Sequence, residues 1–391
     1  MNVWPFFPNW NSRYSESYEY ATEIIVSDSG KEQRRAWIQA ARRSVSYRAL
    51  VNRDRMRALR RTLANRGGSF IFPDEVRRAR VVSATTTAAT FDAALPDWLA
   101  TGRRVVFEDR STRGREVRVV DSVSGATATF AAPSARTWAP GTRVMPALTG
   151  TLAPTIRASA HTDDVVEMPV ELDVEPGTEF ETVGLPAHTF GGLEVLTHRP
   201  DWSDRVEFES VDPTVRSDMG FGVRSTYRAV AFTTEIVRRT HLVWDADQLN
   251  QTLGLFQRSR GRQGEFYVPS WTNDISLAAP TAAGSSVFTV AGHDFFDAYA
   301  TDTVRRCFMV RMVGGSLLYF RIASMAKSTS GGARTLITTT TAAPANIDPS
   351  TLSAVCWMPV CRFASDTLTV SWITDTTADI TMNLQALEDR L

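Results

Sequence analysis

The chain has 391 residues, which is enough for two or more domains, because a single hydrophobic core rarely extends beyond about 250–300 residues. Hydrophobic residues make up 43% of the sequence and charged residues 22%, as in an ordinary folded protein. Lys plus Arg and Asp plus Glu both total 43, so the charge balance argues against a nucleic acid as the main partner.

The N-terminal segment MNVWPFFPNW lacks the basic region and the long apolar run of a signal peptide. No segment approaches the roughly 18–20 apolar residues of a membrane-spanning helix. We therefore expect a product that stays in the cytoplasm in which it is made. The cysteines, Cys307, Cys356 and Cys361, form an odd set without CxxC spacing, which predicts buried free thiols.

The first 65 residues predict strands followed by one helix. Residues 17–27 alternate β-branched and aromatic side chains and predict a strand that ends in a turn at 28–30. Residues 32–50 are ambiguous, but the alternation at their end favours a strand pair over at least the second half. Residues 52–65 predict an amphipathic helix that Asn52 or Asp54 caps, with one apolar stripe and a stop at Gly67-Gly68; the stripe is Met56, Leu59 and Leu63.

The next region predicts a small antiparallel β-barrel. Short strands at 103–108, 115–120 and 127–130 are separated by Gly, Ser and Asp clusters, and the segment 139–146 closes the set. The strand 165–172 (VVEMPVEL) then returns to the first sheet. Its alternation marks one buried face, and Pro169 indicates an edge or a bulge.

The second part of the chain predicts the same order of elements. Strands are expected at 225–232 and 235–244, followed by a helix from about Asp247 with Leu249, Leu253 and Phe256 facing inward. Further strands are expected at 306–313, 316–324, 334–341, 367–375 and 378–387.

Internal matches indicate that one module is present twice. The residues that define the repeat are Trp10, Gly68, Phe70 and Pro73 in the first copy, answered by Trp202, Gly264, Phe266 and Pro269 in the second. The spacing rises from about 192 to about 196 residues, and later matches lie about 213 residues apart. These later matches pair Val144-Met145-Pro146 with Trp357-Met358-Pro359, and 165–172 with 378–385.

The matches predict a mainly β protein with one short helix per repeat and two platforms, each a sheet with a barrel or β domain inserted. The first platform is expected at 1–76 plus 144–175 with its barrel at 77–143, and 176–195 is expected to be a linker. The second platform is expected at 196–275 plus 357–391, with its inserted β domain at 276–356.

No motif predicts a catalytic, metal or cofactor site. The five histidines, His161, His188, His198, His241 and His293, form no HExxH pair, and no GxSxG, Walker or GxGxxG motif is present. The basic groups at 34–43 and 258–264 fit either a polyanion or, more consistently with the overall neutrality, a solvated face or an ion-paired subunit interface.

Three segments resemble distal or minor tail proteins of long-tailed bacteriophages: 8–47 (PNWNSRYSESYEY and onward), 261–278 (GRQGEFYVPSWTNDISLA) and 138–146 (WAPGTRVMP). The resemblance implies a structural virion protein of the tail tip with a tail-tube-like β-sandwich, no enzyme activity and no cofactor. It also implies a ring that joins the tail tube to the hub or baseplate, contacts the tape measure protein, and lets DNA pass transiently through its channel.

A chain with two tube-like platforms is compatible with two rings. Three chains give a ring with pseudo-sixfold symmetry, and six chains give two stacked rings. Two other functions remain open at this stage. Ten Trp residues and many short strands suit a receptor-binding or carbohydrate-binding tail module, and a tail-associated hydrolase would need carboxylates or a nucleophile that converge from distant positions.

Overall fold

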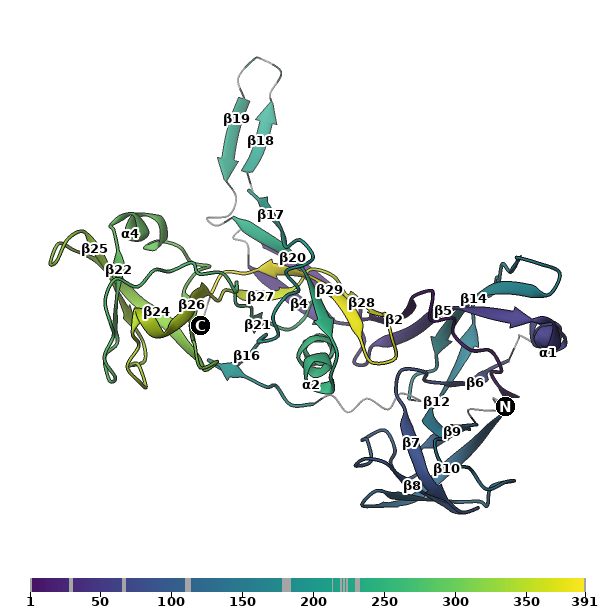
Figure 1. Cartoon of the computed structure of the whole chain (residues 1–391). Helices are drawn as coiled ribbons and strands as arrows, with labels where there is room; N and C mark the ends of the chain where they lie inside the picture. Colours follow the sequence, from purple (N-terminus) through teal and green to yellow (C-terminus); the bar gives the residue numbers. More distant parts are fainter. Residues whose placement is uncertain are drawn as a thin grey trace.

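The computed structural model describes residues 2–27, 31–64, 68–109, 114–177, 184–212, 214–218, 220, 222, 224–228 and 233–389. The fold is mainly β, as the alternation patterns predict. Figure 1 shows a long band of strands that crosses the molecule, with one insertion below it and one beside it. The expected turn at 28–30, the glycine stop at Gly67 and the end of the strand expected at 225–232 lie outside the described residues.

The first repeat contains β1 (Asn2–Val3), β2 (Tyr14–Glu19), β3 (Thr22–Val26), β4 (Glu32–Ala36), β5 (Arg42–Asn52), α1 (Arg53–Ala64), β6 (Phe70–Pro73), β7 (Ala79–Ala84), β8 (Ala88–Phe91), β9 (Arg104–Glu108), β10 (Arg115–Ser124), β11 (Thr127–Phe130), β12 (Arg143–Leu152), β13 (Ser159–Ala160) and β14 (Val165–Val174).

The second repeat contains β15 (Thr189–Phe190), β16 (Leu193–Val195), β17 (Glu207–Val211), β18 (Thr214–Asp218), β19 (Arg224–Arg228), β20 (Thr234–Val243), α2 (Ala246–Leu249), the π-helical turn η1 (Asn250–Gly254), α3 (Leu255–Arg258), β21 (Phe266–Tyr267), β22 (Val287–Ala291), α4 (Asp294–Tyr299), β23 (Cys307–Met312), β24 (Leu317–Ser328), β25 (Arg334–Thr339), η2 (Pro349–Thr351), β26 (Leu352–Trp357), β27 (Val360–Phe363), β28 (Thr367–Trp372) and β29 (Ala378–Ala386). The strands β15 and β16 lie inside the stretch expected to be a linker.

The strand pairings of the first repeat recur in the second. The main sheet has the order β13-β14-β5-β2 in one and β28-β29-β20-β17 in the other. Beside it, β1-β6-β12 corresponds to β16-β21-β27, including the parallel first pair. Single hydrogen bonds repeat as well: Asn9 N donates to the Arg48 carbonyl at 2.7 Å, and Asp201 N donates to the Thr240 carbonyl at 2.8 Å.

The structure corrects the alignment of the later matches. The buried residues Met168, Val170 and Leu172 of β14 occupy the places of Ile380, Met382 and Leu384, so 166 corresponds to 378, one residue beyond the sequence match. The second match is shifted by two residues. Asp74 N donates to the Pro146 carbonyl, whereas Ser270 N donates to the Trp357 carbonyl, so Pro146 corresponds to Trp357 and not to Pro359.

The expected strand at 17–27 is divided. Strand β2 ends at Glu19, and β3 leaves the main sheet to form a hairpin with β4. The break follows from Tyr20, whose ring is buried against Phe256 and whose backbone N–H donates to the Asp366 carbonyl in the other repeat. A contact between distant parts of the chain therefore interrupts a pattern that is locally continuous.

The two insertions share their strand order but differ in closure. In the first, β12-β7-β8-β11-β10-β9 pair around a complete circle, which makes a closed barrel. In the second, β22-β25-β24-β23-β26 form an open sheet, and an isolated bridge between Leu277 and Val290 stands where the first has a strand pair. The same register shift recurs, at Val120/Ser122 in β10 and at Ile322/Ser324 in β24.

Pro169 lies at a local gap in the pairing of β14. One side of the strand pairs with β5 along its length. The other side pairs with β13 at 166–167 and with β12 at 172–174, so Pro169 falls between these partners. Because proline has no N–H to donate, this gap explains how it is accommodated inside the strand.

A buried ion cluster fixes β2 and β5 to the loop that follows β6. The Arg43 guanidinium donates to Glu16 at 3.0 Å and to Asp74 at 2.9 Å, and Arg77 contacts the same two carboxylates. The side chains of Glu16, Arg43 and Asp74 are at most 1% exposed.

We predict that Arg43→Met destabilises the protein by about 3–5 kcal/mol, because it leaves two buried carboxylates with too little compensation. Arg48→Met on the same strand is the matched control. The Arg48 side chain, which forms an ion pair with Glu167, is 60% exposed. The expected loss of stability in this control is therefore below about 1 kcal/mol. Chemical denaturation of the two variants checks this, and equal losses of stability would contradict it.

Candidate assembly interface

The two main sheets join edge to edge into one sheet. Strand β2 of the first repeat pairs antiparallel with β28 of the second, from Tyr14 opposite Trp372 to Glu19 opposite Thr367. The continuous order is β13-β14-β5-β2-β28-β29-β20-β17. We call this contact between the repeats, with the side-chain contacts around it, the internal junction.

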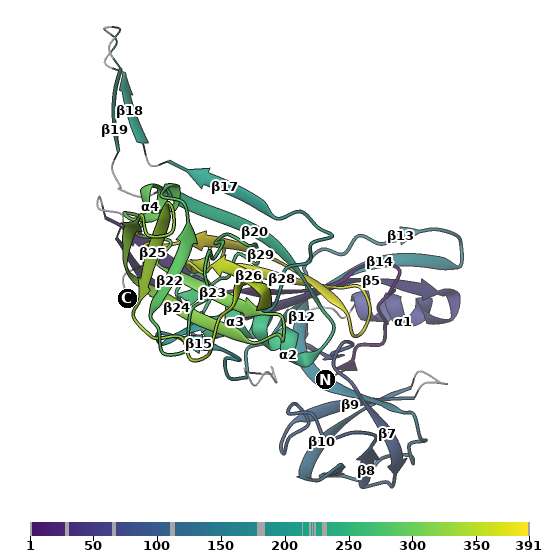
Figure 2. The ribbon, with the colours of Figure 1, turned by 60° about the vertical axis from the view of Figure 1, so that its left-hand side comes forward.

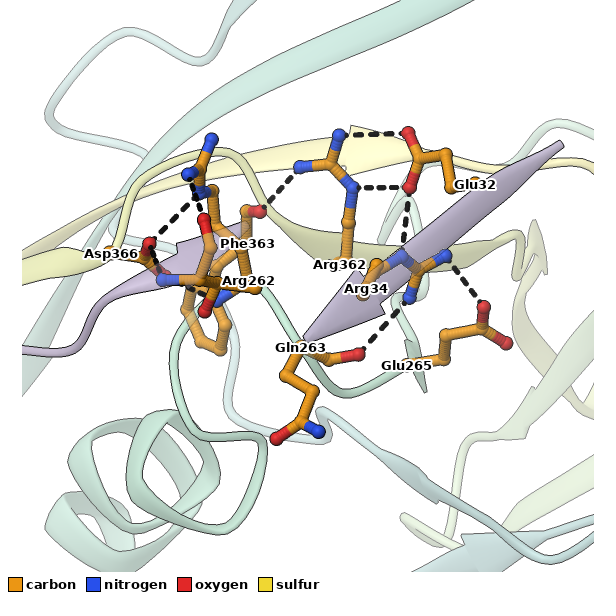
Figure 3. Close-up of polar contacts among 9 residues, drawn as sticks. Glu32, Arg34, Arg262, Gln263, Glu265, Arg362, Phe363 and Asp366 are labelled. Carbon is orange, nitrogen blue, oxygen red and sulfur yellow. Dashed lines mark hydrogen bonds and ion pairs between the residues drawn. The ribbon is translucent and has the colours of Figure 1, made fainter. Parts of the chain in front are cut away.

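The hairpin β3–β4, here called the first arm, reaches across the internal junction onto the second repeat (Figure 3). Glu32 accepts two hydrogen bonds of 2.9 Å from Arg362 and one of 2.8 Å from Arg34. Arg34 also donates to the Gln263 carbonyl and, at 2.7 Å, to Glu265. Although burial alone raises the pKa of Glu32, hydrogen bonds and charge from Arg362 and Arg34 lower it below the ordinary value.

Asp366 is the second anchor of the first arm. Its carboxylate accepts from Thr22 N at 2.7 Å, from Arg262 N at 2.9 Å and from Arg262 Nε at 3.1 Å. Gly261 permits this approach, because its φ of +66° is left-handed and an added Cβ would lie 2.6 Å from Asp366 Oδ1. The duplicated segment 261–274 therefore begins with a turn that is shaped for the internal junction.

The helices of the two repeats are covered to different extents. In the second repeat, Leu253, Leu255 and Phe256 are almost completely buried, and they belong to one apolar core that extends into the first repeat. In α1, Leu59 is the buried apolar residue among those whose side chains are described. The difference follows from position, since the second helix lies at the internal junction.

A turn of the second repeat forms one wall of a cleft whose other walls belong to the first repeat. The first cleft, of about 830 Å³, is lined by Pro8, Trp10 and Leu50 together with Ile373, Thr374 and Asp375 from the turn between β28 and β29. Asp375 forms an ion pair with Arg78 on the wall of this cleft. The internal junction thus combines a strand pair, an arm and a turn that contacts the first repeat beside the first cleft.

The second repeat contains counterparts of β2 and of the first arm, but neither meets a counterpart of β28 in the described part of the chain. Strand β17 corresponds to β2 and is exposed along its whole length, with Phe208 70% exposed. The hairpin β18–β19, here called the second arm, corresponds to the first arm in register and projects away from the body (Figure 1).

The first repeat contains a counterpart of β28 whose outer edge is not paired in the described part of the chain. Residues 155–160 correspond to β28, yet the structure gives them a two-residue strand, β13, beside β14. Figure 2 shows that the hairpin β13–β14 and the second arm extend from different ends of the molecule. The continuous sheet therefore has two complementary edge strands. The edge at β17 resembles β2, and the edge at 155–160 resembles β28.

One face of the continuous sheet is polar. The opposite face of β2, β5, β14, β28 and β29 packs on the core, so alternate residues of these strands point away from it. The outward residues are mostly Ser, Thr, Asn, Gln and charged side chains, among them Ser15, Ser17, Arg42, Ser44, Ser46, Arg48, Glu171, Asp173, Thr367, Thr369, Ser371, Thr381, Asn383 and Gln385.

Of the residues that define the repeat, the Phe and Pro pairs have equivalent surroundings in the two copies, whereas the Trp and Gly pairs do not. Phe70, Phe266, Pro73 and Pro269 are buried in equivalent places beside β12 and β27. Trp10 stacks on Tyr14 with ring centroids 5.7 Å apart, whereas Trp202 is 53% exposed. Gly68 has open space around it, but an added Cβ at Gly264 would lie 2.7 Å from Ser259, so the two glycines are retained under different constraints.

Four arginines of the basic groups at 34–43 and 258–264 form ion pairs within the chain, and the expected subunit interface stays a prediction. Arg34, Arg43 and Arg262 pair as described, and Arg258 forms a 2.5 Å ion pair with Glu194. The residues that sequence reasoning missed are Arg362, which donates to Glu32, and the acceptor Asp366. Both lie far along the chain and belong to no recognisable motif.

The described residues contain no group of three or more His, Cys, Asp or Glu side chains that could hold a metal ion. The three cysteines are free and buried, as expected. His198 and His241 lie together, with ring centroids 5.4 Å apart. Within the described ranges, no helix combines the length and apolarity needed to cross a membrane. No protein-family profile matches the sequence, and no curated protein matches it.

We predict that Asp366→Ala loosens the first arm. Removing the carboxylate leaves Thr22 N and Arg262 without their acceptor, so hydrogen exchange of the β3 and β4 amides should become at least about tenfold faster. Asp218→Ala in the second arm is the matched control and should leave the first arm unchanged. Unaltered exchange in Asp366→Ala would show that the carboxylate does not hold the arm.

We also predict acid destabilisation through His241. Burial, together with the charges of His198 and Arg239, lowers its pKa to about 3. The unfolded histidine has a pKa near 6.5. The contribution of neutral His241 to the free energy of unfolding is therefore complete above that pH, and it falls by up to ~1.4 kcal/mol per pH unit between about 6.5 and 3. Thermal melting of His241→Leu should depend less on pH over this range, while His161→Leu, at an exposed position, should keep the wild-type slope.

Proposed function

We propose that this chain is a structural subunit of a ring at the tail tip of a long-tailed bacteriophage. Two observations support the proposal. The sequence segments described above resemble distal tail proteins. The chain also contains one side-by-side junction between two β platforms, and the corresponding edges at the two ends of the sheet, β17 and 155–160, have no such partner among the described residues. The internal junction is the observation that carries the proposal.

The open edges support a head-to-tail assembly. An edge like β2 on one chain meets an edge like β28 on the next, so each new contact repeats the internal junction and leaves the same edges open. Such a heterologous interface closes into a ring when its rotation permits. The platforms meet in the plane of one sheet, which favours a single ring of three chains with pseudo-sixfold symmetry over two stacked rings.

The dimensions of this ring suit a channel. Three chains would contribute about 24 strands, which at a spacing of about 4.8 Å and a tilt of about 40° close into a cylinder roughly 45–50 Å across. A DNA duplex is narrower than this cylinder. The polar face of the sheet would line the channel, because the other face is occupied by the core, helices and insertions. The channel would continue that of the tail tube, with the tape measure protein inside and the hub below.

We predict that the purified protein forms rings with a central channel in electron micrographs, and that light scattering gives the mass of three chains. Phe208→Asp should reduce assembly at least about tenfold, because it places a charge on the exposed edge strand. Val123→Asp, at a 41% exposed position in the first barrel, is the control and should assemble normally. A wild-type protein that remains monomeric at all concentrations would contradict the proposed function.

A further inference from the structure

A second cleft, in the second repeat, corresponds to the first cleft. It has a volume of about 670 Å³, and Pro200, Trp202 and Leu242 line it where Pro8, Trp10 and Leu50 line the first cleft. The turn of the β28–β29 hairpin lines the first cleft through Ile373, Thr374 and Asp375. No segment of the described chain occupies the corresponding place in the second cleft.

The second cleft is cationic. Arg199 and Arg311 both lie over the Trp271 ring, with guanidinium carbons 5.1 Å and 6.0 Å from its centre. Neither arginine forms an ion pair with a carboxylate in the described part of the chain. Asp201 is the acidic residue among the lining residues. The cleft therefore offers two cations to an anionic group.

The chain carries a turn of the matching shape. Residues 161–165, between β13 and β14, correspond to 373–377 and have the same hydrogen bonds. His161 N donates to the Val165 carbonyl at 2.9 Å, as Ile373 N donates to the Thr377 carbonyl at 2.9 Å. Val165 N donates to Thr162 Oγ1 at 3.1 Å, and Thr377 N donates to Thr374 Oγ1 at 3.0 Å.

The charge at the tip of this turn fits the second cleft. Asp163 corresponds to Asp375, which pairs with Arg78 in the first cleft. Asp163 is exposed, and Asp164 beside it forms a 3.4 Å pair with the largely exposed Arg53. The cations of the two clefts come from different positions, yet in each cleft an aspartate at the same point of the turn would meet arginine.

The edge register leads to the same placement. If β17 pairs with 155–160 of another chain as β2 pairs with β28, Glu209 lies opposite Arg157, since Ser17 lies opposite Thr369. This pairing joins opposite charges. The turn 161–165 follows 155–160 directly, as the turn 373–377 follows β28, so the paired edge would bring it to the second cleft.

We propose that the second cleft is the docking site for the turn His161–Asp164 of the next copy of this chain, with Asp163 held by Arg199 and Arg311. The inference rests on the proposed ring and adds the residues that determine which surfaces meet. A neutral glycan is the competing occupant, because Trp202 and Trp244 are more than half exposed at the cleft, but it would leave both arginines without an anion.

Charge reversal tests the docking. Asp163→Arg, and separately Arg199→Glu with Arg311→Glu, should each weaken assembly at least about tenfold by analytical ultracentrifugation. Combining the three substitutions should restore at least part of the loss, which a purely structural defect would not do. Asp121→Arg, on β10 of the barrel, makes the same charge change away from both surfaces and should assemble normally. Melting temperatures identify any variant that misfolds.

A cross-link provides an independent measurement. Asp163→Cys with Leu317→Cys, the latter on the lining of the second cleft, should oxidise to covalent oligomers between chains. Wild-type rings combined with normal assembly of the charge variants and no cross-link would overturn the docking site and leave the ring standing. Wild-type monomers at all concentrations would overturn both. Binding of a neutral oligosaccharide in the second cleft of assembled rings would also overturn the docking site.

Discussion

The structure depends on backbone hydrogen bonds that a sheet edge cannot satisfy by itself. An edge strand exposes a row of N–H and C=O groups that either face water or pair with another strand. At the internal junction these groups are paired within the chain, because β2 of the first repeat pairs with β28 of the second. The same need persists at β17 and at residues 155–160, which have no such partner within the described ranges. The organisation of the chain and its proposed assembly both follow from this one requirement.

Much of the fold could be predicted from local patterns. Alternation located β5, β14, β20 and β29, and apolar stripes located α1 and the segment α2–η1–α3 but not α4. Internal matches showed that the elements recur. The failures have physical causes. Tyr20 breaks a continuous pattern because of a partner more than two hundred residues away, and the matches at 378–385 were misplaced by one residue because sequence similarity does not record which face of a strand is buried.

The candidate interface was less accessible to sequence reasoning. The basic groups around Arg34 and Arg262 were visible, but their acceptors Glu32, Glu265 and Asp366 come from three separate segments. No periodicity links such positions. The second cleft was also hidden, since Arg199 and Arg311 belong to no motif and are brought together by the packing of the second insertion beside β16 and β21.

The covalent link between the repeats changes the energetics of assembly. Joining separate bodies costs translational and rotational freedom at every encounter, estimated at about 4–15 kcal/mol each. In a pseudo-sixfold ring built from tandem chains, every second contact is already formed when the polypeptide folds. Half of the encounters are therefore intramolecular, and the effective concentration of the first partner is set by the tether between the repeats rather than by the number of chains in the cell. Tandem duplication would therefore allow a closed annulus to form at a lower protein concentration than single-platform subunits of equal affinity would require.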